Sequence, residues 1–176
     1  MRIVVSGTHA SGKSTLVDAF ADRHPGFEVL ADPFEFVDDA GDEPDAGVFA
    51  AQLRIASARL IALAPAERAI AERGPLDFLA YLAALDALGR PGRAGALFEQ
   101  GVDLAARAMS NVDLLVLLPL EAGIRVPEDE DPELRAAMDG ALLDLADDID
   151  LTGGARVVEL GGSPAARLAG LEAELG

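Results

Sequence analysis

The chain has no cysteine and no tryptophan, and it contains only one lysine and one tyrosine among its 176 residues. Without cysteine, disulfide bonds and thiolate metal sites are excluded. Only 5% of the residues are aromatic while 51% are hydrophobic, so the core must consist mainly of aliphatic side chains and alanine. This length and apolar content are typical of one folded domain, and we expect residues 1–176 to form it.

Basic residues are also scarce: the chain has 14 basic and 31 acidic residues, which gives a net charge of -17. A molecule of this charge repels phosphodiester backbones at long range, so we expect no nucleic acid partner. The longest apolar run, residues 114–120, is too short to cross a membrane. The first residues lead directly into the motif described below and leave no room for a cleavable signal. We therefore expect a cytoplasmic protein without a membrane partner.

Strand-like and helix-like segments alternate along the chain. Short apolar runs indicate strands at residues 3–5, 27–31, 68–72, 113–118 and 157–160. Apolar residues recur at helical spacing in residues 13–23, 47–63, 75–89, 96–110, 132–149 and 163–175. Such alternation is typical of a parallel sheet covered by helices, and it predicts a three-layer α/β/α fold with about five parallel strands.

The segment from Gly7 to Thr15 carries the most specific motif. Residues 7–14 read Gly-Thr-His-Ala-Ser-Gly-Lys-Ser and match G-x-x-x-x-G-K-[ST] in every fixed position, after a predicted strand and at the start of a predicted helix. The glycines let successive backbone amides point toward a phosphate, and the helix start adds its positive dipole end. We therefore expect a phosphate-binding loop (P-loop) that binds a purine triphosphate, with ATP as the first candidate.

Each position of this loop has an expected role. Lys13, the only lysine of the chain, would reach the β- and γ-phosphates, and the Ser14 hydroxyl would bind Mg²⁺. His9 occupies a position that the motif leaves variable, so we expect it in the solvent-facing part of the loop. The expected nucleotide-binding residues are Gly7, His9, Ala10, Ser11, Gly12, Lys13, Ser14 and Thr15.

Two classes of P-loop protein are disfavoured. A GTPase needs an Asn-Lys-x-Asp motif to recognise guanine, and the single lysine is already part of the P-loop. A hydrolytic motor usually has four apolar residues followed by Asp-Glu, and neither residues 69–72 nor residues 113–118 end in this way. A kinase, a nucleotide-dependent switch, or a P-loop protein without catalytic activity remains.

Four further features follow the P-loop in order. They are Asp32-Pro33 after the second strand, Gln52 with Arg59, Glu72-Arg73-Gly74 with Asp77 and Tyr81, and Gly161-Gly162-Ser163-Pro164 with Arg167. Together with the P-loop they resemble the small kinase branch of P-loop proteins. The chain is similar to deoxyribonucleoside kinases, and more closely to small AAA-type ATPase domains related to the nicotinamide riboside kinase domain. The resemblance covers nearly the whole chain, but only the P-loop is highly specific.

The resemblance implies catalytic roles for residues at two strand ends. Asp32 takes the position of the general base, with Glu35 as its nearby rival and a turn-forming Asp before Pro as the structural alternative. Glu72 would hold Mg²⁺ together with Ser14, and Arg73 would neutralise the transferring phosphate. The structural alternative for Glu72 and Arg73 is a surface ion pair.

The resemblance also implies residues for the small-molecule acceptor, possibly a nucleoside. Gln52 and Arg59 lie seven residues apart and hence on one helical face, where a carboxamide could read a base edge. Arg73 and Asp32 would contact the acceptor as well. Asp77 is either a further acceptor ligand or a helix cap. Gly162 would lie beside the adenine of ATP and contact it through the backbone.

The lid over the phosphates is expected at about residues 121–133, with Arg125 as its catalytic cation. Here the sequence departs from the resemblance, because the acidic residues 128–131 replace the several arginines of a nucleoside kinase lid. Two functions therefore stay open: a Mg·ATP-dependent kinase for a hydroxyl of a nucleoside-like metabolite, and an ATP-dependent switch whose acidic segment 127–132 acts on a protein partner. The apolar helices between residues 47 and 110 could also form a homodimer face.

Overall fold

The computed structural model describes residues 1–36, 45–120 and 131–176. Its five strands are all parallel and form one sheet in the order β2-β3-β1-β4-β5. They are β1 (Arg2–Ser6), β2 (Glu28–Leu30), β3 (Ala69–Glu72), β4 (Leu114–Leu117) and β5 (Arg156–Glu159). The predicted fold class is therefore confirmed.

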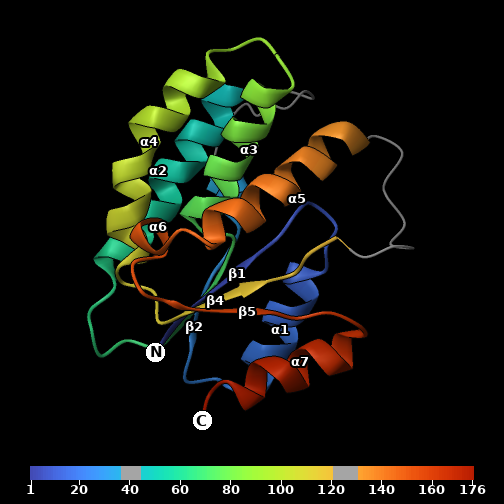
Figure 1. Ribbon diagram of the computed structural model, residues 1–176. Coiled ribbons are helices and arrows are strands. Elements are labelled where there is room, and N and C mark those ends of the chain that lie inside the picture. Colours follow the sequence, from blue (N-terminus) through green and yellow to red (C-terminus); the bar gives the residue numbers. More distant parts are fainter. Residues whose placement is uncertain (37–44, 121–130) are drawn as a thin grey trace.

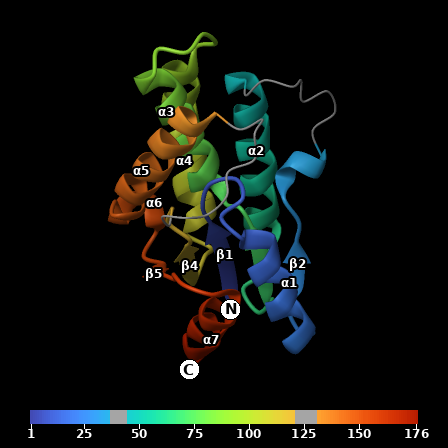
Figure 2. The ribbon, with the colours of Figure 1, turned by 90° about the vertical axis from the view of Figure 1, so that its right-hand side faces the viewer.

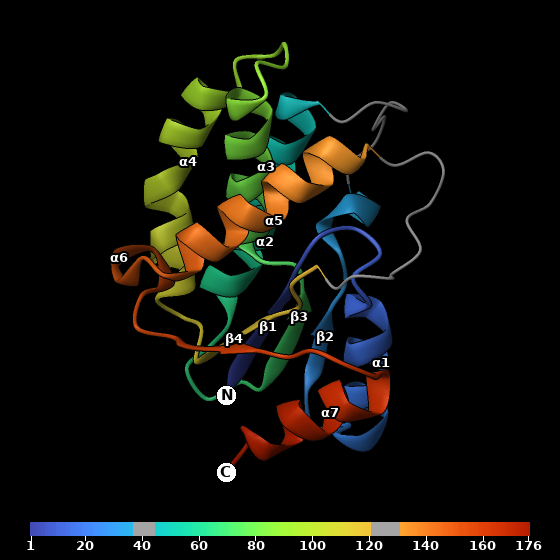
Figure 3. The ribbon, with the colours of Figure 1, turned by 45° about the vertical axis from the view of Figure 1, so that its right-hand side comes forward.

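Helices cover both faces of this sheet (Figures 1 and 3). They are α1 (Lys13–Arg23), the 3-10 helix η1 (Pro33–Phe36), α2 (Ala46–Ala62), α3 (Pro75–Ala87), α4 (Ala94–Met109), α5 (Pro132–Ala146), α6 (Ile149–Thr152) and α7 (Pro164–Ala173). Helices α1 and α7 lie on one face, and the other α-helices lie on the opposite face (Figure 1). No helix in the described ranges is long and apolar enough to span a membrane.

The central strand β1 contributes to the cores on both faces because successive side chains of a strand point in opposite directions. Ile3 and Val5 belong to the buried cluster that includes Phe20 of α1. Val4 belongs to the larger cluster formed with α2 to α6. The continuous apolar run Ile3–Val5 in this strand is what a sheet buried on both faces requires.

One expected helix ends earlier than its apolar pattern suggests. The pattern predicts a single helix up to Ile149, but α5 ends at Ala146 and Asp148 starts the short helix α6. The Asp148 side chain accepts a hydrogen bond from the Asp150 amide, which is typical of a helix N-cap. Ile149 is 74% exposed, so its predicted place on the buried face was wrong.

The sheet topology determines where a ligand can bind. The neighbours of the central strand β1 are β3 on one side and β4 on the other. The chain therefore adds β2 and β3 on one side of β1 and then β4 and β5 on the other side, so the strand order reverses at β1. Ligands of open α/β sheets bind at the carboxyl ends of the strands where the strand order reverses. The loop from β1 to α1 lies at this edge (Figure 2). The segments that follow the parallel strands β2 and β3 begin at the same edge.

Candidate nucleotide-binding and active site

The backbone of the loop between β1 and α1 has an unusual conformation. Gly7, Ala10 and Gly12 have positive φ angles of 156°, 54° and 89°. A Cβ atom on Gly7 would lie 2.8 Å from the carbonyl oxygen of Leu118, so no other residue fits this position without displacement. Left-handed residues of this kind curl the chain into a concave surface lined by amide groups, which is the geometry of an anion nest.

The first turn of α1 leaves donors available to such an anion. Backbone N–H groups at a helix start have no partner within the helix, and those of residues 13–15 form no other backbone hydrogen bond within the described part of the chain. Gly12, the N-cap residue, has no side chain that could satisfy them. The positive end of the helix dipole lies at the same place, so the site favours a phosphate.

Lys13 lies folded over its own loop. Only 4% of the residue is exposed, and its Nζ donates to the Thr8 carbonyl oxygen at 2.5 Å and lies 3.5 Å from the Ser11 hydroxyl. Burial, aided by the positive charge of Arg73, lowers the pKa of Lys13 to about 7. A phosphate next to Nζ would add negative charge to that of Asp77, Glu72 and Asp32 and would raise the pKa of Lys13 again.

Ser14 and Glu72 form an oxygen pair beside the loop. The Ser14 hydroxyl donates to Glu72 Oε1 at 2.7 Å, which connects α1 to the end of β3. A hydroxyl and a carboxylate are hard ligands that fit Mg²⁺, and Mg²⁺ usually keeps waters and binds substrate phosphates besides one or two protein oxygens. The described residues contain no group of three His, Cys, Asp or Glu side chains arranged for a metal, so an all-protein metal cage is not what this part of the chain offers.

Asp32 and Arg73 meet at the carboxyl ends of the adjacent strands β2 and β3. Arg73 Nε lies 2.7 Å from Asp32 Oδ2, and the two side chains are 10% and 20% exposed. Asp32 Oδ1 also accepts from the Phe34 amide at 3.0 Å, so Asp32 forms the expected turn and the ion pair at once. The Arg73 guanidinium lies 5.6 Å from the centre of the Tyr81 ring. Arg73 therefore pairs with Asp32, and not with Glu72 as in the surface ion pair that the sequence left as an alternative for those two residues.

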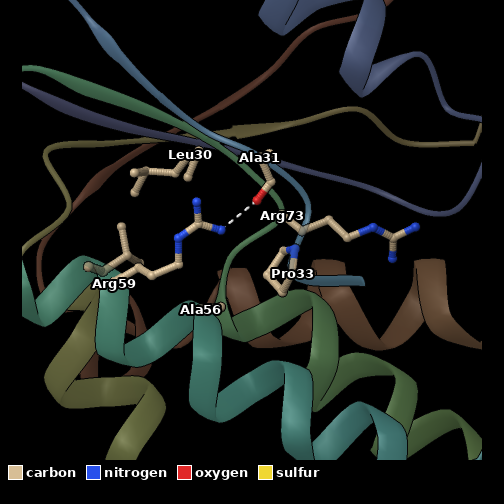
Figure 4. Close-up of a pocket in the computed structure, with 8 residues that line it drawn as sticks. Leu30, Ala31, Pro33, Ala56, Arg59 and Arg73 are labelled. Atoms are coloured by element: carbon tan, nitrogen blue, oxygen red, sulfur yellow. Dashed lines mark hydrogen bonds between the residues drawn. The ribbon is translucent and has the colours of Figure 1, made fainter. Parts of the chain in front are cut away.

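Two of the expected acceptor residues, Arg59 and Arg73, line a small cavity of about 10 Å³ between β2, β3 and α2, whereas Asp32, Gln52 and Asp77 do not line it. Arg59 donates to the Ala31 carbonyl oxygen at 2.7 Å, and the Arg73 side chain extends away from Arg59 (Figure 4). Gln52 on α2 is 2% exposed. The Tyr81 ring is stacked on Phe49 at 4.3 Å. The cavity is the size of a single water and is therefore too small to hold a metabolite.

Asp77 does not lie in an acceptor position. It is fully buried, and its carboxylate accepts hydrogen bonds from Ser6 Oγ, the Gly7 amide and the Gly74 amide. It belongs to the capping box at the start of α3. The structure thus supports the capping alternative, and we correct the expectation that Asp77 binds the acceptor, because both of its oxygens are already engaged.

Two arginines from helices late in the chain bind the P-loop. Neither had an expected role, although Arg167 was among the features that carried the resemblance. Arg167 of α7 donates to the Ser11 carbonyl oxygen at 2.6 Å, and Arg135 of α5 donates to the His9 carbonyl oxygen at 3.2 Å. Both residues are buried. In the sequence, Arg135 is a single basic residue in an otherwise apolar and acidic helix, and Arg167 follows the Gly161-Gly162-Ser163-Pro164 segment. Neither signal identifies the partner of the arginine.

The remaining expected residues have different outcomes. His9 is exposed at the outer side of the loop, as is Ala10. Gly162 is exposed, with a φ angle of 83°, before the N-terminus of α7. Arg125 and most of the expected lid at residues 121–133 lie outside the described residues, as does the Glu35 side chain.

The fold and the site define a P-loop protein of the kinase-like class. The chain belongs to the AAA domain family, whose model matches residues 2–167. No curated protein matches it.

Among solved structures, deoxyadenosine kinase from M. mycoides with bound products has a TM-score of 0.73 at 15% identity, and the match covers 99% of this chain and 98% of that chain. Thymidylate kinase from Candida albicans has a TM-score of 0.69 at 16% identity, covering 99% and 90%. The NadR protein in complex with NAD and AMP-PNP has a TM-score of 0.65 at 20% identity, covering 98% of this chain and 48% of that one. At these identities the likeness establishes the fold.

Proposed function

We propose that this protein is a kinase that transfers the γ-phosphate of Mg·ATP to a hydroxyl group of a small nucleoside-like metabolite. The observation that carries the proposal is the pairing of Asp32 with Arg73 at 2.7 Å directly beside the P-loop. Glu72, the neighbour of Arg73, accepts from Ser14 of the P-loop. A carboxylate, an arginine and a phosphate-binding loop thus converge at one edge of the sheet, which is what phosphoryl transfer requires. We propose that residues 1–176 act as one such kinase-like domain.

In this reaction the acceptor oxygen forms a bond to the γ-phosphorus. The bond from the γ-phosphorus to the oxygen that bridges it to the β-phosphorus breaks, and ADP leaves. Asp32 takes the proton of the attacking hydroxyl. Lys13 exchanges the Thr8 carbonyl for phosphate oxygens, and Arg73 stabilises the charge that spreads over the transferring group. Ser14 and Glu72 would hold Mg²⁺, which would further neutralise the phosphate charge.

The acceptor class has support from two sides. The similar structures include a deoxyadenosine kinase, a thymidylate kinase and a NadR protein in complex with NR, whose names refer to nucleosides or nucleotides. In this chain, the buried carboxamide of Gln52 offers one donor group and one acceptor group, as recognition of a base edge requires. The stacked Phe49 and Tyr81 rings provide an aromatic wall near Arg73.

The test is ADP release from Mg·ATP measured with and without a panel of nucleosides and related hydroxyl compounds. We expect one class of compound to stimulate release and to appear as a phosphorylated product by mass spectrometry. Slow ADP release that no compound stimulates would instead support the nucleotide switch.

Nucleotide binding is tested separately with Lys13→Ala. We expect calorimetry to show Mg·ATP affinity reduced by at least about 100-fold, because the variant loses the ammonium group that faces the phosphates. Arg54→Ala removes an exposed cation of α2 and serves as the matched control with unchanged affinity. Equal affinity of wild type and Lys13→Ala would refute the P-loop assignment.

A further inference from the structure

Asp77 makes more contacts than a helix cap needs. A capping residue at this position of α3 has to satisfy only the Gly74 amide, which donates to Asp77 Oδ2 at 2.8 Å. The same oxygen also accepts from Ser6 Oγ at 2.6 Å, and Oδ1 accepts from the Gly7 amide at 3.0 Å. The two additional partners belong to another part of the chain, about 70 residues earlier.

These contacts connect the two halves of the proposed active site. Ser6 is the last residue of β1, and Gly7 provides the first amide of the P-loop. Gly74 directly follows Arg73, whose own amide donates to the Val5 carbonyl oxygen at 3.0 Å. One carboxylate in the first turn of a buried helix therefore holds the entrance of the P-loop and the turn that presents Arg73.

The charge of Asp77 lies between the cations of the site. Burial raises the pKa of the Asp77 carboxyl, while the charges of Arg73 and Lys13 act against this rise. A carboxylate buried with 0% exposure is costly unless nearby cations and hydrogen bonds compensate it. Here the compensation comes from two residues that the proposed reaction uses on the phosphate.

There is little room for either segment to shift. A Cβ atom on Gly74 would lie 2.6 Å from a methyl carbon of Val4, so the turn after β3 packs directly against β1. Arg73 itself has a φ angle of 63°, which is unfavourable for a residue with a side chain and must be maintained by its surroundings.

We propose that Asp77 is a positioning residue that fixes the P-loop and the Arg73 turn relative to each other, so that nucleotide binding and phosphoryl transfer depend on the same carboxylate. This inference rests on the proposed function. It assigns Asp77 neither to the acceptor nor to the reacting atoms. It predicts that the loss of one buried carboxylate impairs both halves of the site together.

The primary test is Asp77→Asn, which keeps the shape of the side chain. An amide can accept hydrogen bonds through only one oxygen, so either the Gly7 amide or the Gly74 amide must face an NH₂ group and lose its acceptor. We expect the Kd for Mg·ATP to rise at least about tenfold, since hydrogen bonds to charged groups contribute this much. We expect kcat at saturating ATP to fall at least about tenfold as well, because small misplacements of catalytic groups are costly.

Two further variants separate positioning from general stability. Leu85→Ala creates a cavity in the same helix, at a residue that is 3% exposed; it should lower Tm and leave Kd and kcat of the folded protein within about twofold. Ser6→Ala removes a single donor to Asp77 and keeps the carboxylate, so it remains informative if Asp77→Asn does not fold. We expect Ser6→Ala to change Kd and kcat in the same direction as Asp77→Asn, by smaller factors.

Amide hydrogen exchange in the absence of nucleotide makes the test independent of the proposed function. Asp77→Asn or Ser6→Ala should reduce the protection of the Gly7 and Gly74 amides together, whereas Leu85→Ala should not single them out. Loss of protection at Gly74 alone would reduce Asp77 to a helix cap and overturn the proposal. The proposal is also overturned if wild type binds Mg·ATP and Asp77→Asn binds it equally well. If wild type binds no nucleotide, the proposed function fails, and the exchange result alone decides whether Asp77 joins the two segments.

Discussion

At the scale of single residues, backbone strain is found where the proposed chemistry needs a fixed geometry. Arg73 has a left-handed backbone, which costs about 1–2 kcal/mol for a residue with a Cβ atom. This conformation brings the Arg73 side chain to Asp32 and Tyr81. The hydrogen bond from the Arg73 amide to the Val5 carbonyl oxygen helps to maintain the conformation. A glycine would adopt the same backbone without strain but would offer no guanidinium group, so the strain is consistent with a functional role for the side chain.

The role of Asp32 as general base gives a residue-scale prediction. Asp32→Asn keeps the side-chain volume and the possible bond to the Phe34 amide, but it removes the proton acceptor and the charge partner of Arg73. We expect kcat to fall by about 10²–10⁴, which is the usual contribution of general base catalysis, while the Kd for Mg·ATP stays within a few-fold of wild type.

Steady-state ADP release and calorimetry measure these two quantities. Asp103→Asn, at an exposed position of α4, removes the same charge far from the sheet edge and should leave both unchanged. An Asp32→Asn variant with wild-type kcat would show that the proton leaves by another route, with Glu35 as the next residue to change.

At the scale of secondary-structure elements, the helix starts are encoded locally. Asp131 precedes Pro132, and its side chain accepts from the amides of Glu133 and Leu134. Ser163 caps α7 in a similar way, with Pro164 as the first helical residue. A polar cap followed by proline is a strong start signal, which explains why the sequence predicted these two starts within one residue.

Removal of the α5 cap should therefore destabilise the protein measurably. We expect Asp131→Ala to lower the free energy of unfolding by about 0.5–2 kcal/mol, with the exposed ion pair to Arg90 adding little. Urea unfolding followed by circular dichroism measures the change. Asp144→Ala removes an exposed acid from the interior of the same helix and should be neutral or slightly stabilising; an equal loss in both variants would argue against a capping effect.

The sequence predicted the elements better than the contacts between them. Within the described residues, the periodicity located every strand and six of the seven α-helices, and the P-loop motif located the loop between β1 and α1. These signals could be recognised because they lie within short segments. The bonds of Arg135 and Arg167 to the loop span 126 and 156 residues, and no local pattern identifies such partners. Asp77 was ambiguous for the same reason, since a capping position and an acceptor position look alike until the helix is placed against β1.

At the scale of the whole molecule, several of the few cations lie where an anion would bind. Against a net charge of -17, five buried or half-buried basic residues lie at the P-loop edge of the sheet: Lys13, Arg59, Arg73, Arg135 and Arg167. The half-buried Arg2 instead pairs with Asp113 at the other end of β1. The potential of the five residues at the P-loop edge, together with the loop amides, can attract a triphosphate despite the acidic surface. The remaining charge is mostly negative and distributed over the outside, where the residues repel one another.

This repulsion should make stability depend on ionic strength. Between about 0.01 M and about 0.1 M NaCl the screening length falls from about 30 Å to about 10 Å, so long-range repulsion in the folded state is largely removed. We therefore expect the free energy of unfolding in urea to rise with NaCl over this range at neutral pH, and to rise much less near the pI of about 4.3, where the net charge vanishes. Equal gains at both pH values would mean that salt acts through hydrophobic burial or specific ion binding and not through the net charge.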